Sequence, residues 1–274
     1  MNATRLVSSL AGLGRLAVAF SGGTDSALVL AAAVRALGPA DVLAVTADSA
    51  SLAATELAGA RAIAADLGVR HLTPATGELA VPEYAANGRQ RCYFCKTTVL
   101  TTIAGVAAAH GFRALATGTN ADDAVDPFRP GIRAGDEIGV HTPLRTLGLS
   151  KPDVRAIVRS WGLAWAAKPA APCLASRVRY GVPITPATLA RVERAEAVVR
   201  AFLAGRRPAC RDLRVRDLGG TARIELDPAV AAAVRDDRRL LDAVRGLGFG
   251  EVTVTPFRSG ALNHEPDGGA PGAR

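Results

Sequence analysis

The sequence predicts an α/β protein in which a parallel sheet carries helices on both faces and a smaller C-terminal α/β domain follows. Two observations lead to this prediction. Short apolar runs alternate with longer segments of helical periodicity, which is the pattern of strand, crossover helix and parallel strand. The first run also ends in a glycine pair, at which an extended chain can turn sharply into a helix. With 274 residues, 49% of them hydrophobic, the chain is long enough for one large domain or two modest ones.

The spacing of the apolar residues is helical at the start of the chain and then changes to that of a strand. Leu6, Leu10 and Leu13 recur at helical spacing, so we expect a helix over 3–13. The apolar run 15–20 has the length of a strand buried in a parallel sheet.

A long apolar segment, 27–37, predicts the next helix, because Gly38 and Pro39 then stop helical continuation. The same alternation repeats after it. It predicts, in order, a strand over 42–47, a helix over 53–67, a strand over 69–72, a helix over 97–110, a strand over 114–118 and a helix over 151–161. An irregular stretch rich in proline and alanine, 168–172, then leads to Cys173.

The pattern changes after Pro183, where we expect a second domain. Its predicted elements are a helix over 186–203, strands over 213–216 and 222–226, a helix over 228–247 and a strand over 251–255. We therefore divide the chain into a domain of residues 1–180, a smaller α/β domain of residues 181–260, and a disordered tail of residues 261–274 that is rich in glycine and proline.

The charge balance favours anionic ligands. The net charge is +8, from 33 lysines and arginines against 25 acidic residues. The arginines are spread over the whole chain and only 4% of residues are aromatic, which argues against a nucleic-acid surface. A solvated basic surface explains the charge equally well. No run approaches the roughly 18 apolar residues of a membrane span and no signal peptide opens the chain, so we expect a cytoplasmic protein without a membrane partner.

The sharpest local signal is the string SGGTDS, between the first predicted strand and a long helix. Gly22 and Gly23 let backbone amides and the helix N-terminus face an anion, and the hydroxyls of Ser21 and Ser26 add donors. The loop predicts a phosphate cradle. It lacks a lysine to reach the terminal phosphate, so hydrolysis there is not implied. Asp25 could hold a metal ion or complement the helix dipole, and the whole string could be an ordinary strand-to-helix turn.

Two other segments lie where ligands of parallel sheets bind. Ala47 is the last residue of the second predicted strand, and Gly118 ends the strand over 114–118, with Thr119 next. These residues therefore lie at the carboxyl ends of strands. Asp122 and Asp123 come shortly after. This acidic pair could orient the site or bind metal, and it could equally be a solvated turn.

Three cysteines stand in unusual local sequences. Cys92 and Cys95 form a CxxC beside Arg91 and Lys96, whose charges favour thiolates. No second CxxC completes a familiar zinc site, and Cys173 is the third unusual thiol. Three cysteines fit a 4Fe–4S cluster with one open iron. A redox-active or adventitious disulfide within the CxxC and an inert, buried Cys173 are the alternatives, and Cys210 has no motif and is expected to be inert.

Arginines of the second half could bind phosphate and carboxylate groups by bidentate contacts. The candidates are Arg177 together with Arg214 and Arg216, which alternate onto one face of a predicted strand. The alternative is that they are strand-edge arginines paired with Asp212 or Asp217.

These motifs carry a family resemblance. The string FSGGTDS resembles the signature of the PP-loop ATP pyrophosphatase superfamily. Six further strings resemble the LarE family in the same order and over nearly the whole chain: RCYFCK, GTNADD, RPG, KPAAPCLASRVRYG, RVR and ARIEL. The resemblance implies a PP-loop fold and an ATP-dependent sulfur insertion into pyridinium-3,5-biscarboxylic acid mononucleotide, during synthesis of the nickel-pincer nucleotide cofactor.

The resemblance also implies ligands and residue roles. ATP would adenylate a substrate carboxylate with Mg²⁺ bound at Asp25, and Ala47, Gly118 and Thr119 would border the adenosine. Lys96 and Ser176 would join the three cysteines in the catalytic set.

The resemblance also bears on a second metal site and on the source of the sulfur. Glu196 and Glu225 match positions that bind a divalent ion in the family. Ala233 stands where the family offers another acidic residue, which argues against that metal site here. Asp123 is a further candidate ligand of a metal ion. Some members give up the sulfur of a single cysteine, matching Cys173, but the three-cysteine pattern favours the cluster route. Homo-oligomers are expected, and the sulfur donor is not identified.

Three other functions compete with this one. A 4Fe–4S-dependent tRNA thiolase also combines a PP-loop with three cysteines, but no RNA-binding module flanks the core. An amide-forming ligase that uses ammonia would not need three placed cysteines. A nucleotide or iron–sulfur binding module without catalysis is the third alternative.

Overall fold

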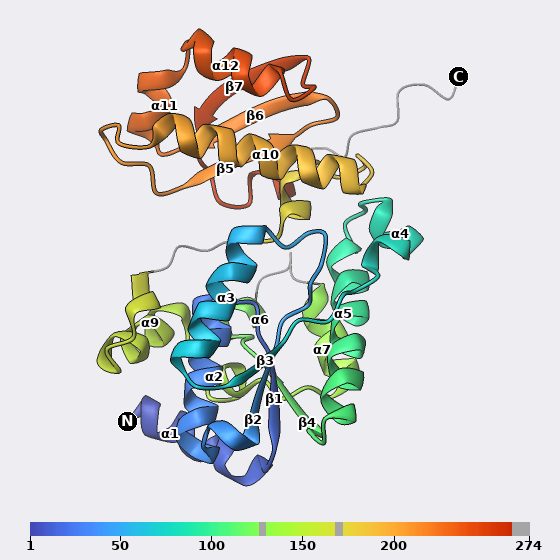
Figure 1. The fold of residues 1–274 in the computed structure, drawn as a ribbon, viewed down its shortest axis with the longest axis vertical. Coiled ribbons are helices and arrows are strands. Elements are labelled where there is room, and N and C mark those ends of the chain that lie inside the picture. The colour runs from blue at the N-terminus through green and yellow to red at the C-terminus, as the bar shows by residue number, and fades with distance from the viewer. Residues whose placement is uncertain (126–129, 168–171, 265–274) are drawn as a thin grey trace. The chain divides into compact units, whose positions relative to one another are not determined.

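The computed structural model describes residues 1–125, 130–167 and 172–264. It contains two compact units (Figure 1), one of Met1–Glu78 with Cys92–Ala171 and one of Leu79–Arg91 with Pro172–Arg274. Most of the predicted irregular stretch, 168–171, and the predicted tail from residue 265 onward lie outside the described residues, as does Arg129 of the RPG string.

In the described part of the first unit the four strands are all parallel, in the order β3-β2-β1-β4. Their bounds are Leu16–Ala19 (β1), Val42–Val45 (β2), Arg70–Leu72 (β3) and Ala114–Thr117 (β4). Strand β1 lies between β2 and β4, with Leu16 opposite both Val42 and Ala114. The parallel sheet predicted from the sequence is therefore confirmed. The order reverses between β1 and β4, where open sheets of this kind bind ligands at their carboxyl ends.

Helices cover both faces of this sheet. One face carries α1 (Asn2–Leu10), α2 (Thr24–Leu37), α3 (Ala54–Asp66) and α9 (Lys151–Ser160), and the other carries α5 (Arg91–Ala109), as Figure 1 shows for α2, α3 and α5. Successive residues of β1 point to opposite faces: Leu16 and Val18 pack with the first group, and Ala17 packs with α5. The other described α-helices of the first unit are short: α6 (Ala121–Ala124), α7 (Gly131–Ile138) and α8 (Pro143–Thr146). The short helix α4 (Pro82–Ala85) belongs to the second unit.

Helix α5 is the one described helix that is long and apolar enough to cross a membrane. Its Leu100, Ile103 and Ala107 are buried in the cluster that also contains Leu43 and Val45 of β2. Packing against the sheet accounts for these apolar residues, as in other core helices.

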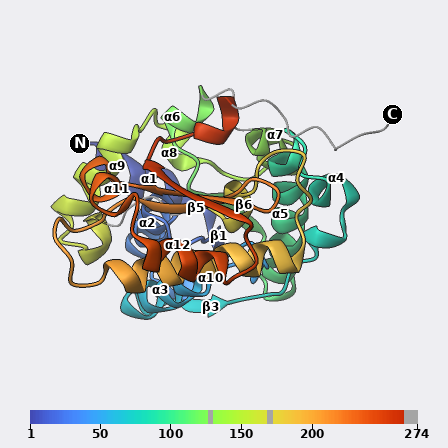
Figure 2. The same cartoon turned by 90° about the horizontal axis from the view of Figure 1, so that it is seen from above.

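The second unit is built on a three-stranded sheet of β5 (Leu213–Asp217), β6 (Thr221–Leu226) and β7 (Glu251–Pro256). Its core lies on one face, where α10 (Pro186–Leu203), α11 (Pro228–Val234) and α12 (Arg238–Arg245) pack; Figure 2 shows α10 and α12 along this face. Strands β6 and β7 are parallel, but β5 and β6 form an antiparallel hairpin. Gly219 and Gly220 make its turn with φ of +93° and +98°.

Two expectations about this half of the chain differ from the structure. The prediction of a single helix over 228–247 is wrong, because this segment forms two helices, α11 and α12. The Asp237 side chain accepts hydrogen bonds from the backbone amides of Arg239 (3.0 Å) and Leu240 (3.3 Å) and so caps the start of the second helix.

The boundary of the two units also differs from the one expected after residue 180. Residues 79–91 group with the second unit, where the buried Asn87 amide donates to the carbonyls of Arg179 and Val182, both at 2.8 Å. Hydrogen bonds between residues some ninety positions apart are invisible in a local pattern.

Candidate functional site

The loop after β1 is closed by its own hydroxyl groups. Gly22 has a φ of +72°, and Gly23 is the N-cap of α2. The Ser26 hydroxyl donates to the Gly23 carbonyl (3.0 Å) and accepts from the Ser21 amide (3.3 Å), with the Ser21 hydroxyl 3.2 Å away. Helix α2 starts at Thr24, three residues earlier than predicted, so that Asp25 and Ser26 lie in its first turn rather than in the loop.

At two positions of the motifs, neighbouring atoms leave no room for a side chain, so glycine is required. A Cβ on Gly118 would lie 2.5 Å from the backbone nitrogen of Ser26, so the end of β4 touches the start of α2. A Cβ on Gly22 would lie 3.0 Å from the Cβ of Ala60. The structure thus brings Gly118 and its neighbour Thr119 to the SGGTDS loop.

The carboxyl end of β2 lies beside this loop. The Thr46 hydroxyl donates to the Phe20 carbonyl at the end of β1 (2.5 Å) and lies 2.8 Å from Nε2 of His71. Burial lowers the pKa of His71, and the charge of Arg61 lowers it further. Ala47 follows and packs, half-buried, on the core that contains α5.

A chain of polar contacts runs from Asp25 to the start of α9. The fully buried Asn120 donates from Nδ2 to Oδ2 of Asp25 (3.1 Å). Its Oδ1 accepts from the Asp123 amide (3.0 Å), while Asp123 Oδ2 accepts from the Asn120 amide (3.4 Å). Oδ1 of Asp123 forms an ion pair with Nζ of Lys151 (3.2 Å), and Asp122 accepts from the Lys151 amide (2.8 Å).

Taken together, these groups suit a bound polyphosphate. The N-terminus of a 14-residue helix, the Gly22–Gly23 backbone and two hydroxyls converge on one loop. Asp25 adds one carboxylate there, which fits Mg²⁺, because this ion takes one or two protein carboxylates and fills its other positions with phosphate oxygens and water. Asp123 is engaged with Lys151 and Asn120, so in this conformation it holds the turn together.

The CxxC lies on a helix. Helix α5 begins at Arg91, six residues earlier than predicted, so Cys92 and Cys95 lie in its first turn and, three positions apart, on one face. Both are half-buried. A Cβ on Gly131 would lie 2.8 Å from Cγ of Lys96, so the start of α7 packs against this turn.

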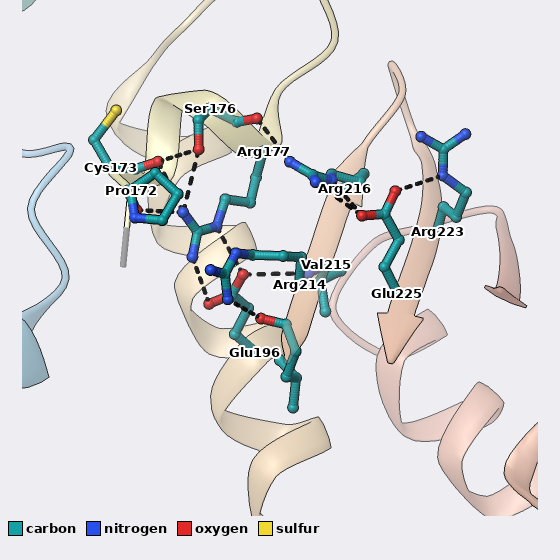
Figure 3. Close-up of polar contacts among 11 residues, drawn as sticks. Pro172, Cys173, Ser176, Arg177, Glu196, Arg214, Val215, Arg216, Arg223 and Glu225 are labelled. Carbon is teal, nitrogen blue, oxygen red and sulfur yellow. Dashed lines mark hydrogen bonds and ion pairs between the residues drawn. The ribbon is translucent and has the colours of Figure 1, made fainter. Parts of the chain in front are cut away.

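Cys173 belongs to the second unit and is exposed. It is the N-cap of a short 3-10 helix, Leu174–Arg177, and its carbonyl accepts from the Ser176 hydroxyl (2.7 Å; Figure 3). All four cysteines, each of which is described, are thiols rather than disulfides. No three His, Cys, Asp or Glu side chains gather as metal ligands among the described residues.

The segment after Cys173 is anchored by a buried ion pair (Figure 3). Arg177 donates from Nε to Oε1 of Glu196 (2.8 Å) and from Nη2 to Oε2 (3.4 Å). Its Nη1 donates to the carbonyls of Pro172 and Cys173 and to the Ser176 hydroxyl. Glu196 also accepts from the Val215 amide on the outer edge of β5 (3.2 Å). Arg177, the last residue of this 3-10 helix, thus binds the backbone at its start, where Cys173 is the N-cap.

The other predicted arginines lie on the face of the second sheet opposite its apolar core, where Arg216 and Glu225 are buried. Arg214 lies opposite Glu225 and Arg216 opposite Arg223, so all four share one face. Glu225 accepts from Arg216 Nε (2.9 Å) and Arg223 Nε (3.1 Å), and Arg216 also donates to the Ser176 carbonyl (3.0 Å). Burial lowers the pKa of Arg214, and the charge of Arg177 lowers it further.

The structure pairs these arginines differently from the alternative reading of the sequence. Arg177 pairs with Glu196 and Arg216 pairs with Glu225, whereas Asp217 pairs with Arg191 (2.5 Å). A divalent ion at Glu196 or Glu225 would therefore compete with guanidinium groups.

Sequence reasoning overlooked three residues that organise these sites: Asn120, Lys151 and Asn87. The capping pattern of GTNADD could have signalled Asn120, because Asn three residues before Asp is a helix-start signature. No local signal marks Lys151 or Asn87, since their partners are distant in sequence.

Comparison with known proteins gives relatives that span nearly the whole chain. An uncharacterized protein of Synechocystis sp. is 41% identical over 256 residues, 92% of this chain and 92% of that protein. A pyridinium-3,5-bisthiocarboxylic acid mononucleotide synthase of Lactiplantibacillus plantarum is 33% identical over 261 residues, 94% of this chain and 92% of its own length. An uncharacterized protein of Methanocaldococcus jannaschii is 24% identical over 61% of the chain. No protein-family model matches.

Proposed function

The chain belongs to the LarE family, and on that basis we propose that it inserts sulfur into pyridinium-3,5-biscarboxylic acid mononucleotide at the expense of ATP. A substrate carboxylate oxygen attacks the α-phosphorus of ATP, pyrophosphate leaves, and an acyl adenylate forms. Sulfide then attacks the activated carbonyl carbon and AMP departs as the leaving group, so that a thiocarboxylate replaces the carboxylate. We place this reaction in the cytoplasm, where thiols remain reduced.

The observation that carries the proposal is the SGGTDS loop at the reversal point between β1 and β4, closed against Gly118. The loop amides and the first turn of α2 would bind the phosphates, and Ser21 and Ser26 hold the loop in shape. Asp25 would orient Mg²⁺ on the pyrophosphate. Ala47 and Thr119, at the ends of neighbouring strands, would border the adenosine.

For the sulfur step we propose the thiols of Cys92, Cys95 and Cys173 as ligands of a 4Fe–4S cluster. When bound, such a cluster would supply one open iron position at which inorganic sulfide is held. Lys96, one residue after the CxxC, would add a positive charge next to this pair of cysteines. Ser176 holds the Cys173 carbonyl, and Arg177 fixes the turn behind it.

For the acceptor we propose the face of the second sheet that carries Arg214 and Arg216. Arg214 and Arg216 would bind the phosphate and a carboxylate of the mononucleotide, because planar guanidinium groups match both anions. Arg177, the third predicted arginine, would act through the segment it anchors.

The decisive experiment measures pyrophosphate released from ATP with pyridinium-3,5-biscarboxylic acid mononucleotide as acceptor, and identifies the product by mass spectrometry. We expect release that depends on the acceptor, and a product in which one oxygen has been replaced by sulfur. Asp25→Ala should lose pyrophosphate release while the fold persists. Asp66→Ala, at the exposed end of α3, is the matched control. A full-rate Asp25→Ala enzyme would contradict the ATP assignment.

The cluster is tested separately by anaerobic reconstitution with iron and sulfide, followed by iron analysis and EPR. We expect about four irons per chain, lost in Cys92→Ala, Cys95→Ala and Cys173→Ala and retained in Cys210→Ala. If no iron binds, Cys173 becomes the sacrificial sulfur donor and the CxxC has another role. If tRNA rather than the mononucleotide accepts sulfur, the tRNA thiolase alternative replaces this proposal.

A further inference from the structure

Lys151 is far from the nucleotide loop in sequence, yet a continuous set of contacts connects the two. Its ammonium pairs with Asp123, whose amide binds Oδ1 of Asn120, whose Nδ2 binds Asp25. Each contact lies between 3.0 and 3.2 Å. All four residues belong to the first unit.

The residues in this set of contacts differ in how deeply they are buried. Asn120 is 0% exposed and Asp123 is 7% exposed, whereas the side chain of Lys151 is 47% exposed. An ion pair between two exposed groups contributes little, but a buried carboxylate needs its cationic partner. Removal of the Lys151 ammonium would take away the ion pair that Oδ1 of Asp123 makes in this buried position.

The orientation of the Asn120 amide depends on Asp123. Its Oδ1 accepts from the Asp123 backbone, so its NH₂ group faces Asp25. If the Asp123 carboxylate turned away or reached for solvent, the capping box that holds Asn120 would open. Asp25 would then lose the hydrogen bond that Asn120 Nδ2 donates to its carboxylate.

Lys151 is itself held at two points. Its backbone amide donates to Asp122 (2.8 Å), and the adjacent Ser150 caps α9 through Asp153. Helix α9 packs in the same core as α2, which carries Asp25. The backbone of Lys151 is therefore fixed at the capped N-terminus of α9, and its ammonium extends from there to Asp123.

We propose that Lys151 is a positioning residue for Asp25: through Asp123 and Asn120 it fixes the carboxylate that faces the metal–nucleotide complex. This inference rests on the proposed function, because it assumes that Asp25 meets Mg²⁺ on ATP. Residues that orient a metal ligand through a hydrogen bond typically change metal affinity by about 10-fold to 100-fold when they are removed.

The test is calorimetric titration with an ATP analogue whose α,β bridge cannot be cleaved, with and without Mg²⁺. We expect Lys151→Met to weaken binding about tenfold in the presence of Mg²⁺ and to leave Mg²⁺-free binding unchanged. Lys151→Arg, which keeps the ion pair, should bind as the wild type does. Arg155→Met, an exposed cation on the same helix, is the matched control.

A double-mutant cycle separates positioning from a merely structural effect. In an Asp25→Ala background, Lys151→Met should cause no further loss of Mg²⁺-dependent affinity. An equal loss with and without Mg²⁺, or a further loss in that background, would overturn the inference, and so would wild-type affinity in Lys151→Met. Thermal unfolding of each variant shows that the fold persists. If the wild type itself binds no nucleotide, the proposed function fails instead.

Discussion

Gly118 and the backbone nitrogen of Ser26 lie so close that a Cβ on Gly118 would be only 2.5 Å from that nitrogen. Strand β4 and helix α2 come from segments nearly a hundred residues apart, and their contact closes one side of the nucleotide loop. Because a backbone atom cannot move aside as a flexible side chain can, the position accepts glycine alone.

This contact gives the first prediction. Gly118→Ala should lower the free energy of unfolding by about 1–3 kcal/mol, the usual cost of overpacking, and should also weaken ATP binding because the start of α2 must shift. Denaturant titration and calorimetry measure the two effects. Gly77→Ala is the control, since nothing lies within 4 Å of its added Cβ. Unchanged nucleotide affinity in Gly118→Ala would mean that the contact does not shape the loop.

The second prediction concerns Cys173, which is exposed and caps a short helix. Cys173→Ala should abolish thiocarboxylate formation and leave acceptor-dependent pyrophosphate release intact, because adenylation uses the loop of the first unit. Quantifying both products in one reaction checks this. Thiolation by Cys173→Ala would remove this residue from the mechanism.

The number of turnovers then separates the two sulfur routes. More than one thiocarboxylate per chain, with sulfide supplied, indicates a centre that is reloaded. A single turnover that converts Cys173 to dehydroalanine indicates a sacrificed thiol.

The third prediction concerns the buried pair of Arg177 and Glu196. Glu196→Ala should lower the free energy of unfolding by about 3–5 kcal/mol, because it leaves a buried guanidinium without its charge partner. It also removes the acceptor of the Val215 amide. Asp242→Ala provides the contrast: its pair with Arg245 is exposed, so its removal should cost less than about 1 kcal/mol. Equal costs in urea unfolding would show that Arg177 finds another partner.

The fourth prediction is a pH dependence of stability that arises from His71. Burial and Arg61 lower the pKa of this imidazole in the folded state below its usual value of 6.5. The unfolded chain therefore binds the proton more readily, so the stabilising contribution of neutral His71 is complete above about pH 6.5 and is lost as the pH falls towards the lowered folded pKa.

Two variants check this origin. His71→Gln removes the titrating group and should flatten the decline in the free energy of unfolding from about pH 7 to about pH 5.5. Arg61→Ala removes the second cause of the shift and should make the decline smaller than in the wild type. An unchanged pH profile in both variants would assign the decline to other groups.

Local pattern was sufficient for the first sheet, and it located the loop motifs. The strands around Leu16 and Val42 read directly as short apolar runs, because strands buried on both faces have no polar positions. The same pattern missed the starts of α2 and α5, because the first turn of a helix needs a cap rather than apolar periodicity. It also merged α11 with α12, since both present apolar residues at compatible spacing.

The sequence by itself determined the parallel sheet, the glycine loop and the identity of the three distinctive cysteines, because these depend on neighbours within a few positions. Only the tertiary structure decided that Asn87 binds Arg179, that Glu196 neutralises Arg177, and that Lys151 reaches Asp25 through Asp123 and Asn120. The physical reason is that buried polar groups must find partners, and the folded chain supplies them from residues distant in sequence.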